Sequence, residues 1–173
     1  MTANVLVAYA SADGSTAEVA QRLGEHLRAT GLQVRIAPAT DSPDPTVVDA
    51  VILGSPIHDG ALLPELTAFV DANLAALLQR PVWLFSLGMG PVLRGPIGAL
   101  LRTKVTPPVA GVRDTVNAVE YHAFAGRFAR SPQLRIRAVM GLLGAVPGDH
   151  RNWDEVAQWA ADISRVVRAR TPD

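Results

Sequence analysis

The sequence contains no cysteine. Without thiols the chain cannot form disulfides, ligate an iron–sulfur cluster, build a thiolate zinc site or use a cysteine nucleophile. Any redox chemistry must therefore come from a bound organic cofactor or from a metal held by histidines and carboxylates. No grouping of these residues along the chain predicts a metal site.

Long apolar runs are also missing. A membrane-spanning helix needs about 20 consecutive apolar residues, and no stretch of this chain approaches that length. The N-terminus enters a strand-like run almost at once, without the basic region and apolar core of a secretory signal. These absences predict a cytoplasmic protein.

Aromatic residues are scarce, at 5% of the chain, although hydrophobic residues make up 49%. Ala, Val, Leu and Ile supply most of this apolar content, which suits helices packed on an aliphatic parallel sheet. A disordered chain lacks such content. A length of 173 residues predicts one domain, residues 1–173, that buries a core covering both faces of a sheet.

The formal net charge is zero, but the charges are unevenly distributed. The segment from Arg94 to Arg137 carries eight basic residues and two acids, whereas up to Arg80 there are four arginines and nine acids. A basic segment of this kind attracts anions, and the alternative is an ordinary solvated arginine surface. We expect small-molecule or protein redox partners and no nucleic acid.

Apolar periodicity divides the chain into alternating strands and helices. Strands are predicted at residues 4–9, 33–37, 49–54, 81–87 and 115–124. Helices are predicted at residues 17–29, 64–77 and 96–104, and after Asn152, which is followed three residues later by Glu155 as in a capping box. This alternation predicts an α/β fold with a parallel sheet and helices on both faces, whose ligand binds at the C-terminal strand ends.

The loop after the first strand, Ser11 to Thr16, is rich in hydroxyls and contains Gly14. A phosphate there would meet backbone N–H groups and the positive end of a helix dipole. The loop lacks the Gly-Lys-Ser/Thr of a Walker A motif and the three glycines of a dinucleotide fingerprint, which argues against ATP and NAD. The alternative is a loop that only turns the chain and caps the helix.

Several segments together resemble the flavodoxin-like family. They are residues 9–16 (YASADGST), 51–57 (VILGSPI), 81–86 (PVWLFS), 124–126 (FAG) and 148–153 (GDHRNW). Within that family the chain is similar to the menaquinone-dependent protoporphyrinogen IX dehydrogenase branch. The resemblance implies a doubly wound three-layer sandwich with a five-stranded parallel sheet in the order 2-1-3-4-5, and flavin mononucleotide (FMN) as the cofactor.

The resemblance also implies which residues bind the cofactor. The phosphate would be held by Ser11, Ala12, Asp13, Gly14, Ser15 and Thr16. The isoalloxazine ring would be lined by Ser55, Pro56, Ile57, His58, Asp59 and Gly60, and by Ser86, Leu87, Gly88, Met89 and Gly90. No side chain is assigned as catalytic, since flavin redox chemistry belongs to the cofactor.

Two features depart from ordinary flavodoxins. Asp13 stands where they have a hydroxyl residue, and a carboxylate repels a phosphate unless it points away. The ring loops offer only His58 in place of the usual aromatic, so the flavin is expected to be less shielded, and an exposed loop histidine is an equally good interpretation of His58.

Three functions remain open at this point. The first is an FMN oxidoreductase that passes electrons from a reduced organic substrate, such as a tetrapyrrole, to a quinone. The second is an electron carrier like flavodoxin itself, although such carriers are strongly acidic and this chain is neutral. The third is a flavodoxin-like domain that binds a deazaflavin or no flavin.

The segment from Arg127 to Leu143 is predicted to lie beside the flavin loops and to touch substrate carboxylates or, peripherally, a membrane.

Overall fold

The computed structural model of the chain describes residues 2–89, 91, 105–128 and 148–170. The strands are β1 (Asn4–Tyr9), β2 (Gln33–Pro38), β3 (Ala50–His58), β4 (Ala61–Leu62), β5 (Val82–Gly88), β6 (Glu120–Ala125), β7 (Arg127–Phe128) and β8 (Gly148–Asp149). The α-helices are α1 (Ser15–Ala29), α2 (Pro64–Leu77), α4 (Pro107–Thr115) and α6 (Trp153–Arg170), and two 3-10 turns are η1 (Ala39–Asp41) and η2 (Pro45–Val47).

Five parallel strands form the sheet in the order β2-β1-β3-β5-β6. Counted along the chain without the short β4, this is the predicted order 2-1-3-4-5, which is therefore confirmed. The order reverses between β1 and β3, and ligands of such sheets bind at this switch point. A separate two-stranded ribbon pairs β7 with β8 in the antiparallel sense.

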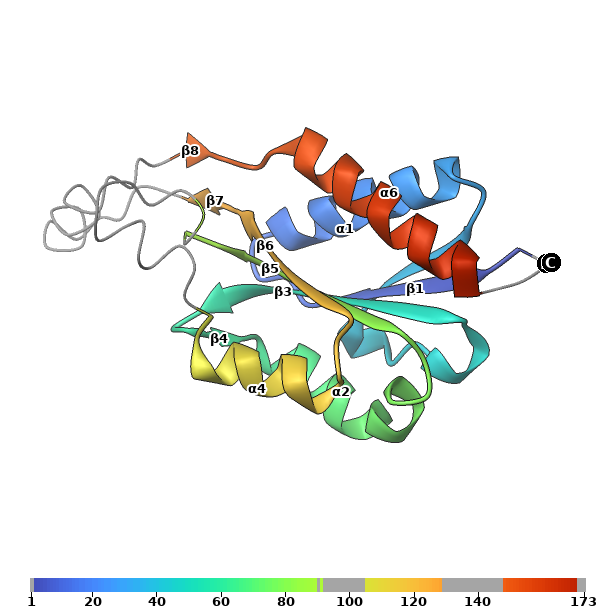
Figure 1. Cartoon of the computed structure of the whole chain (residues 1–173). Coiled ribbons are helices and arrows are strands. Elements are labelled where there is room, and N and C mark those ends of the chain that lie inside the picture. The colour runs from blue at the N-terminus through green and yellow to red at the C-terminus, as the bar shows by residue number, and fades with distance from the viewer. Residues whose placement is uncertain (1, 90, 92–104, 129–147, 171–173) are drawn as a thin grey trace, which may run out of the picture.

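Helices cover both faces of the sheet (Figure 1). One core contains Val5 and Val7 of β1 with residues of α1 and α6, and the other contains Leu6 and Ala8 with residues of α2 and α4. Successive side chains of a strand point to opposite faces, so a continuous apolar strand supplies both cores. The three-layer α/β arrangement is thus the one predicted from the aliphatic runs.

The helix ends follow the local signals in the sequence. Gly31 has a positive φ of 92° directly after α1, and proline occupies the first position of α2. The Asn152 side-chain oxygen accepts hydrogen bonds from the backbone N–H groups of Asp154 and Glu155, at 3.1 and 3.3 Å. The other half of the capping box is absent, because the Glu155 carboxylate contacts His122 Nε2 at 2.9 Å instead.

The predicted strand at 115–124 was wrong at its beginning. Residues 107–115 form α4, and the strand β6 runs only from 120 to 125. Two prolines open this helix, where a missing N–H costs nothing, and Val109 and Val116 are buried on its side of the sheet. The spacing of Val109 and Val116 is helical. Their burial against the sheet therefore outweighs the preference of the β-branched residues in this segment for a strand. The predicted helix at 96–104 lies outside the described residues.

Candidate functional site

The carboxyl ends of the parallel strands bring the predicted loops to one edge of the sheet. Tyr9 of β1 pairs with Gly54 of β3, and Ser55 and Pro56 pair with Ser86 and Leu87 of β5. Three segments far apart in the sequence therefore meet at the switch point in strand order. This edge is the candidate site.

The first loop closes onto the N-terminus of α1. Gly14 adopts a left-handed conformation with φ of 80°, and its backbone N–H donates to Ser11 Oγ at 3.1 Å. No atom of the described residues lies within 4 Å of the position that a Gly14 Cβ would occupy, so this part of the structure leaves the space before the helix open. Ala12 and Asp13 at the tip of the loop are exposed.

The first turn of α1 has unused hydrogen-bond donors. Among the described residues, no side chain caps the helix and no acceptor pairs with the backbone N–H groups of Ser15, Thr16 and Ala17. Helix N-termini of this kind bind anions, because the N–H groups and the helix dipole point the same way. The turn can therefore hold a phosphate without a lysine or a metal.

Thr16 adds a second sign of a missing partner. Its side chain is fully buried, and its hydroxyl finds no hydrogen-bond partner among the described residues. An unpaired buried hydroxyl costs about 1–3 kcal/mol. An anion bound at the first turn is the kind of partner that would offset this cost, so the residues of the first loop fit a phosphate group.

The serines of the second and third loops are engaged within the fold. Ser55 Oγ is buried, donates to the Pro56 carbonyl at 2.9 Å and accepts from the Leu63 N–H at 2.9 Å. Ser86 Oγ lies 2.6 Å from the hydroxyl of Tyr121, and burial raises the pKa of that tyrosine. Both serine side chains hold the strand ends together, which leaves the backbone and the neighbouring residues to face a ligand.

The segment from Ser55 to Gly60 is a strand and a tight hairpin rather than an open loop. Asp59 and Gly60 have φ of 49° and 80°, the conformation of a two-residue hairpin turn. Thr106, just before α4, donates its hydroxyl to the Gly60 carbonyl at 2.6 Å. His58 and Asp59 remain exposed. The hairpin is thus fixed by an anchor that lies 46 residues along the chain.

The third loop begins beside this hairpin. A Cβ at Gly88 would lie 3.6 Å from Ile57 Cδ1, so the end of β5 lies against the end of β3. Leu87 is buried, and Pro56, Gly88 and Met89 are half-buried. Gly90 lies outside the described residues. The structure therefore brings the second and third predicted segments together up to Met89.

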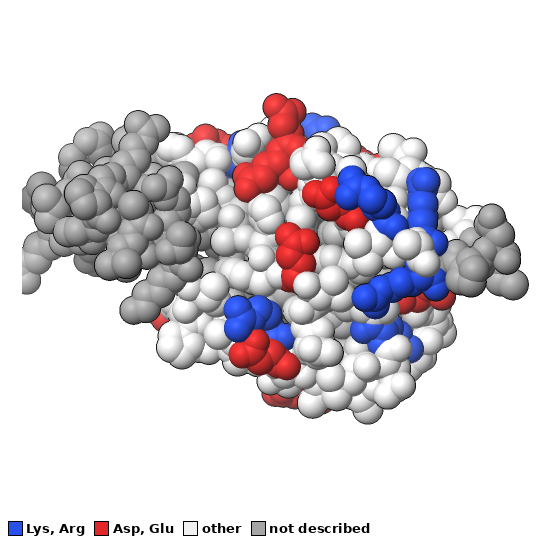
Figure 2. All heavy atoms as spheres, in the orientation of Figure 1, with Lys and Arg blue, Asp and Glu red and all other residues white. Residues whose placement is uncertain are grey.

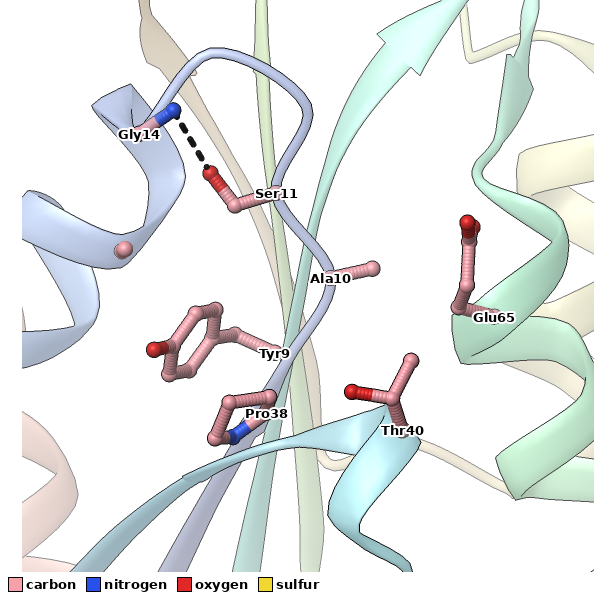
Figure 3. Close-up of a pocket in the computed structure, with 8 residues that line it drawn as sticks. Tyr9, Ala10, Ser11, Gly14, Pro38, Thr40 and Glu65 are labelled. Atoms are coloured by element: carbon pink, nitrogen blue, oxygen red, sulfur yellow. Dashed lines mark hydrogen bonds between the residues drawn. The ribbon is translucent and has the colours of Figure 1, made fainter.

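A cleft of about 290 Å³ opens next to the first loop (Figure 3). Its lining comes from the end of β1 and the loop after it, the end of β2 and the turn after it, and the first turns of α1 and α2: Tyr9, Ala10, Ser11, Gly14, Ala17, Pro38, Thr40 and Glu65. In Figure 3, Thr40 and Glu65 lie on the opposite side of the Ser11 loop from Tyr9 and Gly14. The sequence analysis missed Thr40 and Glu65. Only their positions at the switch-point edge would have indicated that they line the cleft.

Arg127 reaches the first loop from the far end of the chain. Its Nη2 donates to the Asp13 carbonyl at 3.3 Å, across 114 residues of sequence. The sequence analysis predicted that the arginine-rich stretch lies beside the flavin loops, and for Arg127 the structure bears this out. Arg130, Arg135 and Arg137 lie outside the described residues.

Arg151 links the β7–β8 ribbon to α1. Its guanidinium makes ion pairs with Asp149 at 2.6 Å and with Glu18 in the first turn of α1 at 2.7 Å, and it stacks 4.8 Å from the Trp153 ring centroid. The Arg151 hydrogen bonds hold the pKa of Asp149 at about 2, and the hydrogen bond with Asp149 in turn raises the pKa of Arg151. Sequence reasoning missed this cluster, because Glu18 lies 133 residues from Arg151 in the chain.

Replacing Asp149 by Asn is expected to lower the free energy of unfolding by about 1 kcal/mol at neutral pH, since Asp149 is partly exposed and solvent screens the pair. Its pKa falls from 3.8 to about 2 on folding, so the ionised carboxylate stabilises the native state above pH 3.8 and loses this effect as pH falls towards 2. Urea unfolding across this range should show parent and variant converging at low pH. A constant difference would contradict the ion-pair explanation.

The described residues offer neither a metal-binding cluster nor a membrane-spanning helix. No group of three or more histidine, aspartate or glutamate side chains is placed to hold a metal ion there. None of the described helices is both long enough and apolar enough to cross a membrane.

Solved structures of flavodoxins resemble the chain over most of its length. A flavodoxin from the domain Archaea is 14% identical with a TM-score of 0.63, covering 95% of this chain and 98% of that one. Flavodoxin 1 from Bacillus cereus is 17% identical with a TM-score of 0.60, covering 94% and 97%. At this identity the likeness concerns the fold alone.

A larger protein contains the same fold as one part. The Flv1 flavodiiron core from Synechocystis is 15% identical with a TM-score of 0.63, and the match covers 98% of this chain but only 37% of that one. No curated protein matches the sequence.

A family model decides the identity of the domain. The flavodoxin domain model matches residues 6–143, which is most of the chain, and includes the first loop, the β3–β4 hairpin and the end of β5. The resemblance noted in the sequence is confirmed at the level of this family, and the strand order agrees with it. The chain belongs to the flavodoxin domain family.

Proposed function

We propose that the protein is an FMN-binding redox protein whose cofactor phosphate binds at the N-terminus of α1. The observation that carries the proposal is the first turn of this helix, with three backbone N–H groups without acceptors in the described structure and the buried, unpaired Thr16 hydroxyl. Membership of the flavodoxin domain family supports the same assignment. When bound, the isoalloxazine ring supplies the electron transfer.

The chain's own residues orient the ligand under this proposal. Ser11 and Ser15 supply hydroxyls around the phosphate. The β3–β4 hairpin, held by Ser55 and Thr106, and the end of β5 flank the ring. Because the only aromatic side chain between Ser55 and Gly60 is the exposed His58, we expect the flavin face on this side to be open to a substrate or a partner. Because this face is open, a deazaflavin remains an alternative ligand.

The test is a titration of the purified protein with FMN, riboflavin and FAD, followed by quenching of flavin fluorescence. We expect FMN to bind at one equivalent per chain and riboflavin to bind more weakly, because riboflavin lacks the phosphate. Thr16→Val should weaken FMN binding while raising the stability of the flavin-free protein, because it removes an unpaired buried hydroxyl. Equal affinities for FMN and riboflavin would contradict the phosphate site.

For the reaction we propose oxidation of a reduced organic substrate of the protoporphyrinogen type, with a quinone as acceptor. The support is the resemblance of the sequence to the menaquinone-dependent protoporphyrinogen IX dehydrogenase branch and the zero net charge. Figure 2 shows both acidic and basic side chains on one face of the molecule, whereas a carrier that steers to basic partners has a strongly acidic surface. The electron pair and protons that leave the substrate reduce the quinone to its quinol.

A turnover assay separates this enzyme from an electron carrier. We expect the FMN-loaded protein, mixed with protoporphyrinogen IX and a menaquinone analogue, to oxidise many substrate molecules per flavin. Anionic vesicles should increase the rate if the segment from Arg127 to Leu143 also makes peripheral membrane contact. Rapid reduction by a flavodoxin reductase, together with no turnover of any tetrapyrrole, would instead identify a carrier like flavodoxin.

A further inference from the structure

The backbone on both sides of Arg127 is held in place. The N–H of Gly126 donates to the Gly88 carbonyl at 3.2 Å, and the N–H of His150 donates to the Gly126 carbonyl at 3.3 Å. Arg127 then pairs with Asp149 in the β7–β8 ribbon. The side chain therefore begins from a fixed point between the end of β5 and the first loop, where its Nη2 reaches the Asp13 carbonyl.

In the part of the chain that the structure describes, no carboxylate makes an ion pair with Arg127, although its charge lies near enough to Asp149 to help lower the pKa of that carboxyl. Asp149, its partner in the ribbon, directs both carboxylate oxygens to Arg151, at 2.6 and 2.8 Å. No ion pair of Arg127 is found among the described residues, and the guanidinium uses one N–H on the Asp13 carbonyl. A guanidinium has five such donors in a fork that matches phosphate oxygens.

The first loop has no cation of its own. Between Ser11 and Thr16 the only charged side chain is that of Asp13. Glu18, one turn further along α1, is paired with Arg151. A phosphate monoester carries a charge of about −1.5 to −2 at neutral pH, so the helix N-terminus and hydroxyls would leave part of that charge uncompensated beside an acidic residue.

We propose that Arg127 is the cationic side chain that recognises the terminal phosphate of the ligand and selects a phosphorylated flavin over riboflavin. The identity of the ligand as FMN rests on the proposed function, whereas the recognition of a phosphate rests on Arg127 and the first turn of α1.

The experiment compares Arg127→Gln and Arg127→Lys with the matched control Arg165→Gln. Arg165 lies on α6 and is 73% exposed, so its loss removes the same charge at a remote surface. We expect Arg127→Gln to raise the Kd for FMN about tenfold at low salt, the effect of losing one charge-assisted contact. Arg127→Lys should restore part of the affinity, and the Kd for riboflavin should stay within about twofold of the parent value.

Salt dependence is the second readout. The difference between parent and Arg127→Gln should shrink as ionic strength rises, because salt screens an exposed charge pair. Unchanged FMN affinity in Arg127→Gln, or an equal loss for FMN and riboflavin, would overturn the inference. The second result would instead assign Arg127 a structural role in the loop.

Inorganic phosphate separates this inference from the proposed function. If the parent binds no flavin, the proposed function fails, and thermal unfolding with and without phosphate then decides the inference. A phosphate-dependent rise in Tm that is present in the parent and lost in Arg127→Gln supports a phosphate site at Arg127. No rise in the parent, or the same rise in both proteins, overturns it.

Discussion

The Ser15→Glu variant is expected to bind FMN at least about 100-fold more weakly than the parent, which corresponds to about 2.7 kcal/mol. Ser15 is the first residue of α1 and is half-buried beside the open first turn. A carboxylate there would face the phosphate across a few ångströms, where the repulsion amounts to several kcal/mol near a protein surface. The position suits glutamate structurally, because acidic residues stabilise helix N-termini.

Ser15→Gln is the matched control, since it has the same shape without the charge. We expect it to keep most of the FMN affinity, and we expect both variants to bind riboflavin like the parent. Fluorescence titration gives the affinities, and urea unfolding of the flavin-free proteins checks the fold. If Ser15→Glu holds FMN as tightly as Ser15→Gln does, the phosphate binds elsewhere.

The Gly54→Ala variant is expected to be destabilised by about 3 kcal/mol or more, the upper range for overpacking a core. Gly54 is the register partner of Phe85 on the adjacent strand, and a Cβ at this position would overlap the Phe85 ring. The ring has little room to move, because it packs edge to face against Phe124 and Trp159 at centroid distances of 5.9 and 6.0 Å. Urea unfolding measures the loss.

A double-variant cycle checks the cause of this loss. In a Phe85→Leu background, which frees space at the same position, the additional cost of Gly54→Ala should fall by at least about 1 kcal/mol, the coupling expected for residues in contact. Because Gly54 directly precedes Ser55, the single variant should also disturb the ring side of the site. Additive costs in the cycle would show that the glycine is required for another reason.

The first loop could be predicted from the sequence because its chemistry is local. A glycine, hydroxyl residues and the start of an amphipathic helix are neighbours in the chain, and the structure has this turn into a helix, although α1 begins at Ser15 rather than at residue 17. The residues expected to line the flavin ring were harder to predict from the sequence. Ser55 and Ser86 carry hydroxyls like those of the first loop, but their partners Leu63 and Tyr121 lie elsewhere in the chain. Only the folded structure shows that these hydroxyls are already engaged.

Tertiary structure also decided where β6 begins. The composition of residues 115–119 is compatible with a strand, yet α4 occupies the chain up to Thr115, because Val109 and Val116 find a buried surface on one side of the sheet. Propensities are weak beside such burial. The same holds for Glu155, whose side chain leaves the expected helix cap for His122 of β6.

Repeating apolar patterns and local turn signals lie in neighbouring residues, so the α/β fold class and the loop at the start of α1 follow from the sequence alone, and the strand order follows from the resemblance to the flavodoxin-like family. The tertiary structure alone decided the electrostatics of the site. Arg127 meets Asp13, and Arg151 joins Asp149 to Glu18, across 114 and 133 residues of chain. Hydrogen bonds and ion pairs depend on distance in space rather than along the chain, so only the packed sheet edge brings the Arg127 guanidinium to the Asp13 carbonyl and Arg151 to Glu18.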